Sequence, residues 1–124
     1  MTTIKVKARL HPTEDPEKVA VAITNLFGDI ELRLDEEKGL LYGVINEKEQ
    51  LHNLRNTISR DRIRSTLNRT LSRWADEDYL SFGFNRQAAY AGHVSLNLTN
   101  EDPLDPIQVQ IRGDVQDIIE YLTR

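Results

Sequence analysis

The sequence predicts an α+β fold of two layers, in which helices pack on one face of a mostly antiparallel or mixed sheet. Segments that alternate apolar and polar residues, as half-buried strands do, occur near both ends and in the middle of the chain. Segments with apolar residues every three or four positions, typical of amphipathic helices, lie between them. The 124 residues contain no repeat or linker, so we expect one domain over residues 1–124.

The expected strands have one apolar and one polar face and lie at residues 4–10, 30–35, 40–45, 80–84, 94–98 and 107–111. A first helix is expected over residues 16–27, with Asp15 as its N-cap, Pro16 at its first position and Gly28 after its end. The capping-box pattern of residues 46–49 opens a second helix. Further helical segments are expected at residues 63–74, 85–90 and 115–122.

The second and third helices cannot form one straight helix. Leu51, Leu54 and Ile58 form one apolar stripe, and a second stripe consists of Ile63, Leu67, Leu71 and Trp74. At about 100° per residue, the second stripe points well over 100° away from the first. A straight helix would therefore expose one of the stripes to solvent, and we predict a break or sharp bend near residues 59–61.

Composition excludes several functional classes. No segment approaches the roughly 20 apolar residues that span a bilayer, and the N-terminal residues lack the apolar region of a signal peptide. The chain has no cysteine, so we expect a cytoplasmic protein without disulfides or cysteine metal sites. The three histidines lack metal-ligand spacing, and no phosphate-binding loop or nucleophile motif occurs. We expect no metal, no cofactor, no catalytic residue and no enzymatic activity.

An arginine-rich segment is the strongest functional signal. The net charge is −4, yet residues 54–74 hold six arginines and only one acid, Asp61. Arginine donates paired, charge-assisted hydrogen bonds to phosphate oxygens, so a helix face with several arginines can follow a nucleic-acid backbone. Arg62, Arg69 and Arg73 are expected on the outer face of the third helix, with Arg60 and Arg64 beside the bend. A solvated helix face paired with acids elsewhere remains the alternative.

Two other features have simpler interpretations. Lys5, Lys7 and Arg9 form a basic stripe on the first strand, which cross-strand pairing with Glu31 and Asp35 explains. Aromatic residues in the segment 81–84 resemble those of an RNA-recognition sheet, but Phe82 and Phe84 share their strand face with Leu80. We therefore expect both phenylalanines in the core.

Several short strings resemble those of an archaeal group, uncharacterised protein family 0201, over essentially the whole chain. They are Pro12-Thr13-Glu14-Asp15, Arg60-Asp61-Arg62-Ile63, Phe84-Asn85-Arg86-Gln87-Ala88-Ala89, Gly92-His93-Val94 and Pro103-Leu104-Asp105-Pro106-Ile107. The resemblance implies a fold like that of the large-subunit ribosomal protein that binds 5S ribosomal RNA. It also implies a role in RNA binding, accessory to RNA processing or ribosome function, and brings no catalytic residues with it.

Together the arginine segment and the matched strings give a candidate RNA-binding set: Arg60, Arg62, Arg64, Arg69, Arg73, Asn85, Arg86 and Gln87. The expected partner is structured RNA. The competing hypothesis is a protein-interaction or structural module that binds no nucleic acid. A homodimer is also expected, because Leu40, Leu41, Tyr42, Val44 and Ile45 put apolar groups on both faces of one strand. A central strand covered within one chain would explain the same pattern.

Overall fold

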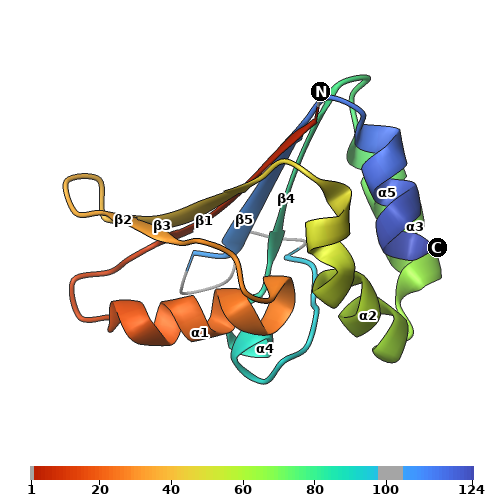
Figure 1. Cartoon of the computed structure of the whole chain (residues 1–124). Coiled ribbons are helices and arrows are strands. Elements are labelled where there is room, and N and C mark those ends of the chain that lie inside the picture. The colour runs from red at the N-terminus through yellow and green to blue at the C-terminus, as the bar shows by residue number, and fades with distance from the viewer. Residues whose placement is uncertain (1, 98–104) are drawn as a thin grey trace.

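The structure, a computed structural model, describes residues 2–97 and 105–124 (Figure 1). The strands are β1 (Thr3–Arg9), β2 (Arg33–Asp35), β3 (Leu40–Ile45), β4 (Tyr79–Phe84) and β5 (Ile107–Arg112). The helices are α1 (Pro16–Phe27), α2 (His52–Arg60), α3 (Arg64–Trp74), α4 (Arg86–Tyr90) and α5 (Val115–Thr123). A short 3-10 turn, η1 (Lys48–Leu51), precedes α2.

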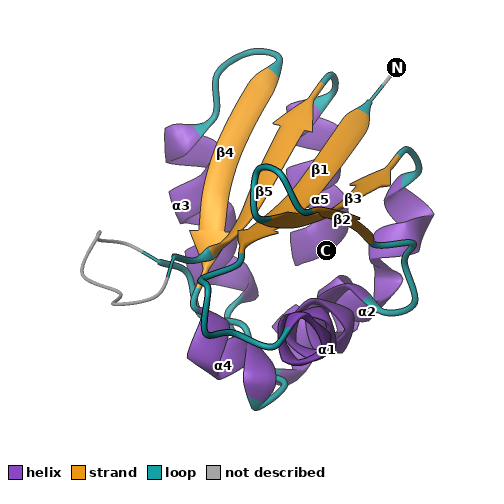
Figure 2. Ribbon diagram, turned by 90° about the vertical axis from the view of Figure 1, so that its left-hand side faces the viewer, coloured by secondary structure: helices purple, strands orange, loops and turns teal. Residues whose placement is uncertain are grey.

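The five strands form one sheet in the order β2-β3-β1-β5-β4, and every neighbouring pair is antiparallel. The helices gather on one side of this sheet, with α1 and α4 under one end and α2, α3 and α5 under the other (Figure 1). No described helix lies over the opposite face, onto which Figure 2 looks. The predicted two-layer α+β fold is confirmed.

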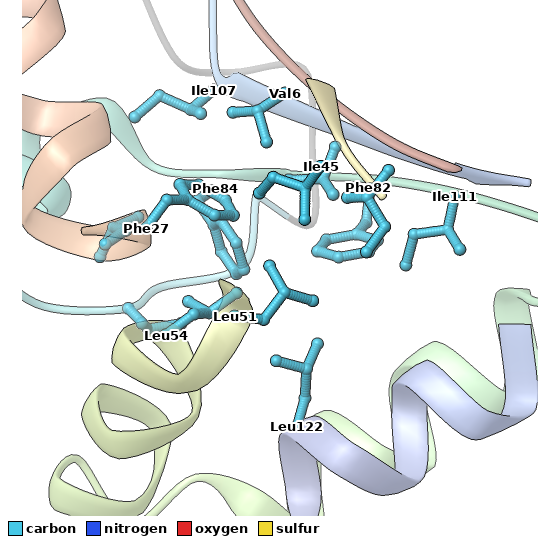
Figure 3. Close-up of a cluster of buried hydrophobic side chains, with 14 of the residues drawn as sticks. Val6, Phe27, Ile45, Leu51, Leu54, Phe82, Phe84, Ile107, Ile111 and Leu122 are labelled. Atoms are coloured by element: carbon cyan, nitrogen blue, oxygen red, sulfur yellow. The ribbon is translucent and has the colours of Figure 1, made fainter. Parts of the chain in front are cut away.

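The core lies between the inner face of the sheet and the helices (Figure 3). Strand alternation supplies its sheet side, because the inward residues of the four longer strands are nearly all apolar and buried: Ile4, Val6, Ala8, Leu41, Ile45, Leu80, Phe82, Phe84, Ile107, Val109 and Ile111. As predicted, Phe82 and Phe84 belong to this core, and their rings meet edge to face with centroids 5.3 Å apart. Leu51, Leu54 and Leu122 approach them from the helical layer.

Helix α1 has the termini that its sequence predicts. The Asp15 side chain accepts a hydrogen bond from the Glu17 backbone amide at 3.0 Å, and Pro16 occupies the first turn. Gly28 ends the helix with φ of 74°, a conformation that a side chain disfavours. Short-range signals of this kind need no tertiary context, which explains why these boundaries were predictable.

Three of the predicted secondary-structure elements differ from the structure. The strand expected at residues 30–35 pairs only over Arg33–Asp35. Residues 30–32 instead pass beneath β3. They approach Gly43 so closely that any side chain there would clash, because a Cβ on Gly43 would lie 2.9 Å from the Glu31 carbonyl oxygen. Around residues 94–98 the only pairing described is a single bridge between Leu96 and Phe84, and residue 98 lies outside the described part.

The third difference concerns the start of the second helical segment. The capping box begins one residue later than predicted, at Glu47 with Gln50 as its partner, and opens the 3-10 turn rather than an α-helix. This shift does not change the packing of the segment, since Leu51 and Leu54 are both buried as predicted.

The predicted break between the two apolar stripes is confirmed. Helix α2 ends at Arg60 and α3 begins at Arg64. Arg62 lies between them with φ of 59°, a left-handed conformation uncommon for residues other than glycine. Leu54 and Leu67 both reach the core. The stripe of α3 ends earlier than predicted, because Trp74 is 39% exposed.

No helix in the described ranges 2–97 and 105–124 is long and apolar enough to cross a membrane.

A buried and an exposed residue of the α3 stripe give a direct test of the fold. Leu67 is 1% exposed, so Leu67→Ala should lower the free energy of unfolding by about 2–5 kcal/mol, because apolar packing is removed and a cavity is left behind. Trp74→Ala, at the exposed end of the same helix, should cost much less. Equilibrium urea unfolding of both variants measures the difference. Equal losses would mean that the core does not extend under α3 as described.

Candidate nucleic-acid interface

The outer surface of α3 carries two of the three arginines that the sequence placed there. Arg69 and Arg73 are exposed and lie one turn apart, on the same side of the helix. No residue of α3 is acidic, so the helix supplies no internal counter-charge. Like charges spaced by four residues repel one another by a few tenths of a kcal/mol. A bound phosphate would relieve that repulsion.

The remaining arginines of the segment are placed differently from one another. Arg62 is exposed but lies in the turn between α2 and α3, so its predicted place on the third helix is wrong. Arg64 is exposed, and its Nη1 donates to the backbone carbonyl of Arg124 at 3.1 Å. Arg60 donates through Nη2 to the Gly92 carbonyl and through Nε to Asp61 at 3.3 Å. Arg60 therefore holds the turn to a neighbouring loop.

Asp61, the single acid of the segment, fastens this turn. Its carboxylate accepts the Val94 backbone amide at 3.0 Å and lies 3.2 Å from His93 Nδ1. Burial by itself would raise the pKa of Asp61, but the hydrogen bonds from Val94, His93 and Arg60 outweigh burial and hold the pKa below its usual value. Because the Asp61 carboxylate is engaged on this side, it does not neutralise the outward arginines of α3.

The second part of the candidate set is Asn85-Arg86-Gln87. The side chains of Asn85 and Arg86 stabilise the fold and are not available to a ligand. The Asn85 side chain caps α4 by accepting the Ala88 backbone amide at 2.9 Å. Arg86 is 0% exposed, so its guanidinium cannot reach a phosphate, and the structure removes it from the candidate surface. Only Gln87 is exposed.

Arg86 is buried because it joins α4 to the end of β1. Its Nη1 donates to both carboxylate oxygens of Glu14 at 2.9 Å, and its Nη2 donates to the Arg9 carbonyl at 2.9 Å. Burial alone would raise the pKa of Glu14. The hydrogen bond from the His11 backbone amide and those from Arg86 outweigh burial and hold that pKa below its ordinary value. A buried charge requires such a partner, which the sequence alone did not reveal.

A second basic surface lies on the face of the sheet that points away from the helices, here called the open face. The register places Lys5 between Val44 and Gln110, and Lys7 between Tyr42 and Gln108. The expected pairing of the basic stripe with Glu31 and Asp35 is therefore wrong. Glu31 instead lies 3.5 Å from Arg33. Arg9 faces Leu40 and approaches Asp105 at 3.9 Å, a long and exposed contact.

Two tyrosines share the open face with these cations. Lys5 Nζ lies 5.7 Å from the centre of the Tyr42 ring, and the Arg112 guanidinium carbon lies 4.6 Å from that of Tyr79. Tyr42 and Tyr79 lie on different strands, far apart in sequence, but belong to the same outward face. Alternation in each strand indicated an outward residue, whereas strand order and register decided which residues are neighbours.

The described residues contain no group of three or more histidine, aspartate or glutamate side chains arranged to hold a metal ion. Both basic surfaces are instead suited to anions, through guanidinium and ammonium donors.

Comparison with known proteins places this architecture in a family. A family model described as RNA binding matches residues 3–113. The chain belongs to this family. Among its relatives, a UPF0201 protein of Metallosphaera sedula is 32% identical over 127 residues, which cover 98% of this chain and 87% of the relative. A UPF0201 protein of Methanothermobacter thermautotrophicus is 30% identical, covering 98% of this chain and 91% of the relative.

Solved structures of UPF0201 proteins share the fold. The crystal structure of the UPF0201 protein from Methanococcus jannaschii has a TM-score of 0.83 at 26% identity, covering 98% of this chain and 99% of that one. The crystal structure of a DUF54 protein from Archaeoglobus fulgidus has a TM-score of 0.71 at 26% identity, covering 98% of this chain and 94% of that one. The resemblance to uncharacterised protein family 0201 is thus confirmed. The expected likeness to the 5S RNA-binding ribosomal protein stays a prediction.

The buried pair of this UPF0201 chain should be visible in the pH dependence of stability. Glu14→Gln leaves the Arg86 charge buried without a counter-ion, which should cost about 3–5 kcal/mol at pH 7. In the unmodified protein the carboxylate stabilises the fold fully above the ordinary pKa of 4.5, and this contribution is lost as the pH falls through the lower folded value. The stability gap between the two proteins should therefore be largest at pH 7 and smallest in strong acid.

Urea unfolding of both proteins at pH 7 and near pH 3 measures that gap. Glu36→Gln, which removes an exposed carboxylate in a turn, is the matched control and should leave the pH dependence nearly unchanged. A Glu14→Gln gap that stays constant with pH would show that the Glu14 carboxylate is not the group that balances Arg86.

Proposed function

We propose that this protein binds structured RNA through the arginines that surround α3. The observation that carries the proposal is a surface of exposed arginines on and beside a helix that has no acidic residue: Arg62, Arg64, Arg69 and Arg73. Asp61, the one acid in the segment, is occupied by His93, Val94 and Arg60. Guanidinium groups bind phosphate oxygens with paired hydrogen bonds, so this surface suits a phosphate backbone.

The family description supports RNA as the partner, and the net charge limits where an RNA could bind. The family model that covers residues 3–113 is described as RNA binding. The chain as a whole carries a net charge of −4, so attraction to a polyanion has to arise from local patches. Such patches orient the protein on its ligand as well as attract it. We infer a role in the cytoplasm, accessory to RNA processing or ribosome function, in which the protein binds without catalysing a reaction.

Salt dependence tests the arginine surface. Replacing Arg62, Arg69 and Arg73 together with alanine should leave the folded state nearly intact, since exposed charges contribute little stability. The variant should bind a structured RNA more weakly, and the slope of log affinity against log salt should fall by up to about three units, one for each phosphate that the variant no longer binds. Fluorescence anisotropy at several salt concentrations measures both effects.

Lys18→Ala combined with Lys38→Ala removes exposed charge away from α3 and serves as the control. It should preserve the salt slope of the unmodified protein. An unchanged slope in a well-folded arginine variant would show that the α3 surface is only solvated. Absence of any binding at about 50 mM salt and about 10 µM protein would favour the competing role, a protein-interaction module without nucleic-acid binding.

We also propose a homodimer, formed along the β2 edge of the sheet. The apolar residues that suggested a dimer divide between the two faces of β3, and Leu41 and Ile45 are already buried in the core. A two-fold interface over the open face would bring Lys5 and Lys7 close to their own copies. The β2 edge avoids that repulsion and presents Leu34, which is 44% exposed beside an edge with unpaired backbone groups.

Light scattering at micromolar concentration should give about twice the 14.3 kDa mass of one chain. Leu34→Lys should shift the protein toward the monomer, because a charged side chain on an edge strand opposes pairing with a second copy. Val21→Lys, a substitution at an exposed apolar residue of α1, provides a control. A mass near that of one chain for the unmodified protein would contradict the dimer.

A further inference from the structure

The open face of the sheet has the composition of a surface that binds unpaired nucleotides. Its central rows combine cations, amides and aromatic rings without an acidic side chain. The outward residues on β1, β3, β4 and β5 are Thr3, Lys5, Lys7, Arg9, Leu40, Tyr42, Val44, Tyr79, Ser81, Gly83, Gln108, Gln110 and Arg112. None of the described helices covers these rows, which face the viewer in Figure 2.

This pattern is difficult to explain by folding alone. An outward sheet face needs polar residues for solubility, but mixed charges serve that purpose with less repulsion. Here Lys5, Lys7 and Arg9 follow one another along the outward side of one strand, and the cross-strand neighbours of the two lysines are neutral. The acids that could balance them lie at the margins. Asp105 approaches Arg9 at 3.9 Å, and on the β2 side Asp35 pairs with Leu40 and Glu31 lies 3.5 Å from Arg33. The centre of the face is therefore a basic strip whose paired strand positions supply no counter-charge.

We propose that this face binds a single-stranded stretch of RNA, with bases stacking on Tyr42 and Tyr79 and phosphates held by Lys5, Lys7 and Arg112. The inference rests on the proposed RNA binding and adds the kind of RNA that the protein takes: one with unpaired nucleotides. Aromatic rings on an open sheet stack bases of any sequence, and flanking cations follow the backbone.

The geometry of the two rings suits one continuous strand. Tyr42 and Tyr79 are separated by three strand spacings and about four residues along the strands, which amounts to roughly 20 Å. The two rings would therefore contact different nucleotides. Between the rings lie the side chains of Lys5, Lys7, Gln108 and Gln110. A cation already lies over one face of each ring, Lys5 over Tyr42 and Arg112 over Tyr79, so a base would stack on the other face or displace the cation. A stacked base would thus have its phosphate close to a positive charge.

The face is distinct from the arginine surface of α3. Helix α3 packs beneath the sheet, on the side opposite the open face (Figures 1 and 2). The two surfaces also differ in chemistry, since the α3 surface consists of guanidinium groups, whereas the open face adds two tyrosine rings to its cations. Duplex RNA presents phosphates but no free base faces, so the surfaces should respond differently to paired and unpaired RNA.

Two RNA probes and two variants separate the surfaces. The probes are a blunt duplex of about 16 base pairs and a uridine oligomer of about 12 nucleotides. Tyr42→Leu with Tyr79→Leu should weaken binding of the oligomer by about tenfold or more per ring and leave duplex binding unchanged. Tyr42→Phe with Tyr79→Phe retains the rings and should bind the oligomer as the unmodified protein does. The α3 arginine variant should lose duplex affinity instead.

Lys5→Gln with Lys7→Gln provides a test that does not alter the rings. It should flatten the salt slope for the oligomer by about 1.4 units, at about 0.7 for each phosphate contact with a single strand. Ultraviolet cross-linking of the unmodified protein to the oligomer should label peptides that contain Tyr42 or Tyr79, a result that does not depend on the folding of any variant.

Every result bears on the open-face site, and some results also bear on the α3 surface. Unmodified protein that binds the duplex but not the oligomer would overturn the open-face site and leave the α3 surface standing. Binding of neither RNA would overturn both proposals. Oligomer affinity that survives in a folded leucine variant, or cross-links confined to α3, would also overturn the open-face site. A change from dimer to monomer in that variant, measured by light scattering, would assign the face to a second copy of the chain.

Discussion

Burial of only one face of the sheet is the constraint on which the rest of this structure depends. Alternation along β1, β3, β4 and β5 directs apolar residues to one side, and an antiparallel sheet is stable with one face in water. The helices then gather where they can cover apolar surface. The same constraint leaves the other face open across the described part of the chain, and its cations and tyrosines remain accessible. The core and the proposed single-strand site are therefore two consequences of one pattern.

The turn between α2 and α3 follows from the same requirement. Two apolar stripes that point in different directions can share a core only if the chain bends between them. The bend places Arg62 in a left-handed conformation, and Asp61 compensates by fastening the turn to His93 and Val94. Packing of Leu67 and Leu71 beneath α3 leaves Arg69 and Arg73 on the outside. The exposed arginine surface is thus a by-product of how the helix is anchored.

Arginine side chains serve several distinct purposes in this small protein. Arg86 is enclosed with Glu14 and joins α4 to β1, Arg60 holds a turn, and Arg112 lies beside a tyrosine ring. Arg69 and Arg73 remain exposed on α3. The positions of the arginines along the sequence could not separate these roles, because the burial and the partner of each side chain depend on residues far away in sequence. Glu14 and Arg86, for instance, are 72 positions apart.

The sequence by itself determined the fold class, the ends of α1, the break before α3 and the core position of Phe82 and Phe84. Each depends on periodicity or on capping signals within a few residues, which act locally. Tertiary structure alone decided that residues 30–32 pass beneath Gly43, that Arg86 is buried, and that Tyr42 and Tyr79 share a face with Lys5 and Lys7. Strand order, register and the partner of a buried charge are set by contacts between distant segments. Local patterns contain no information about which distant segments will meet.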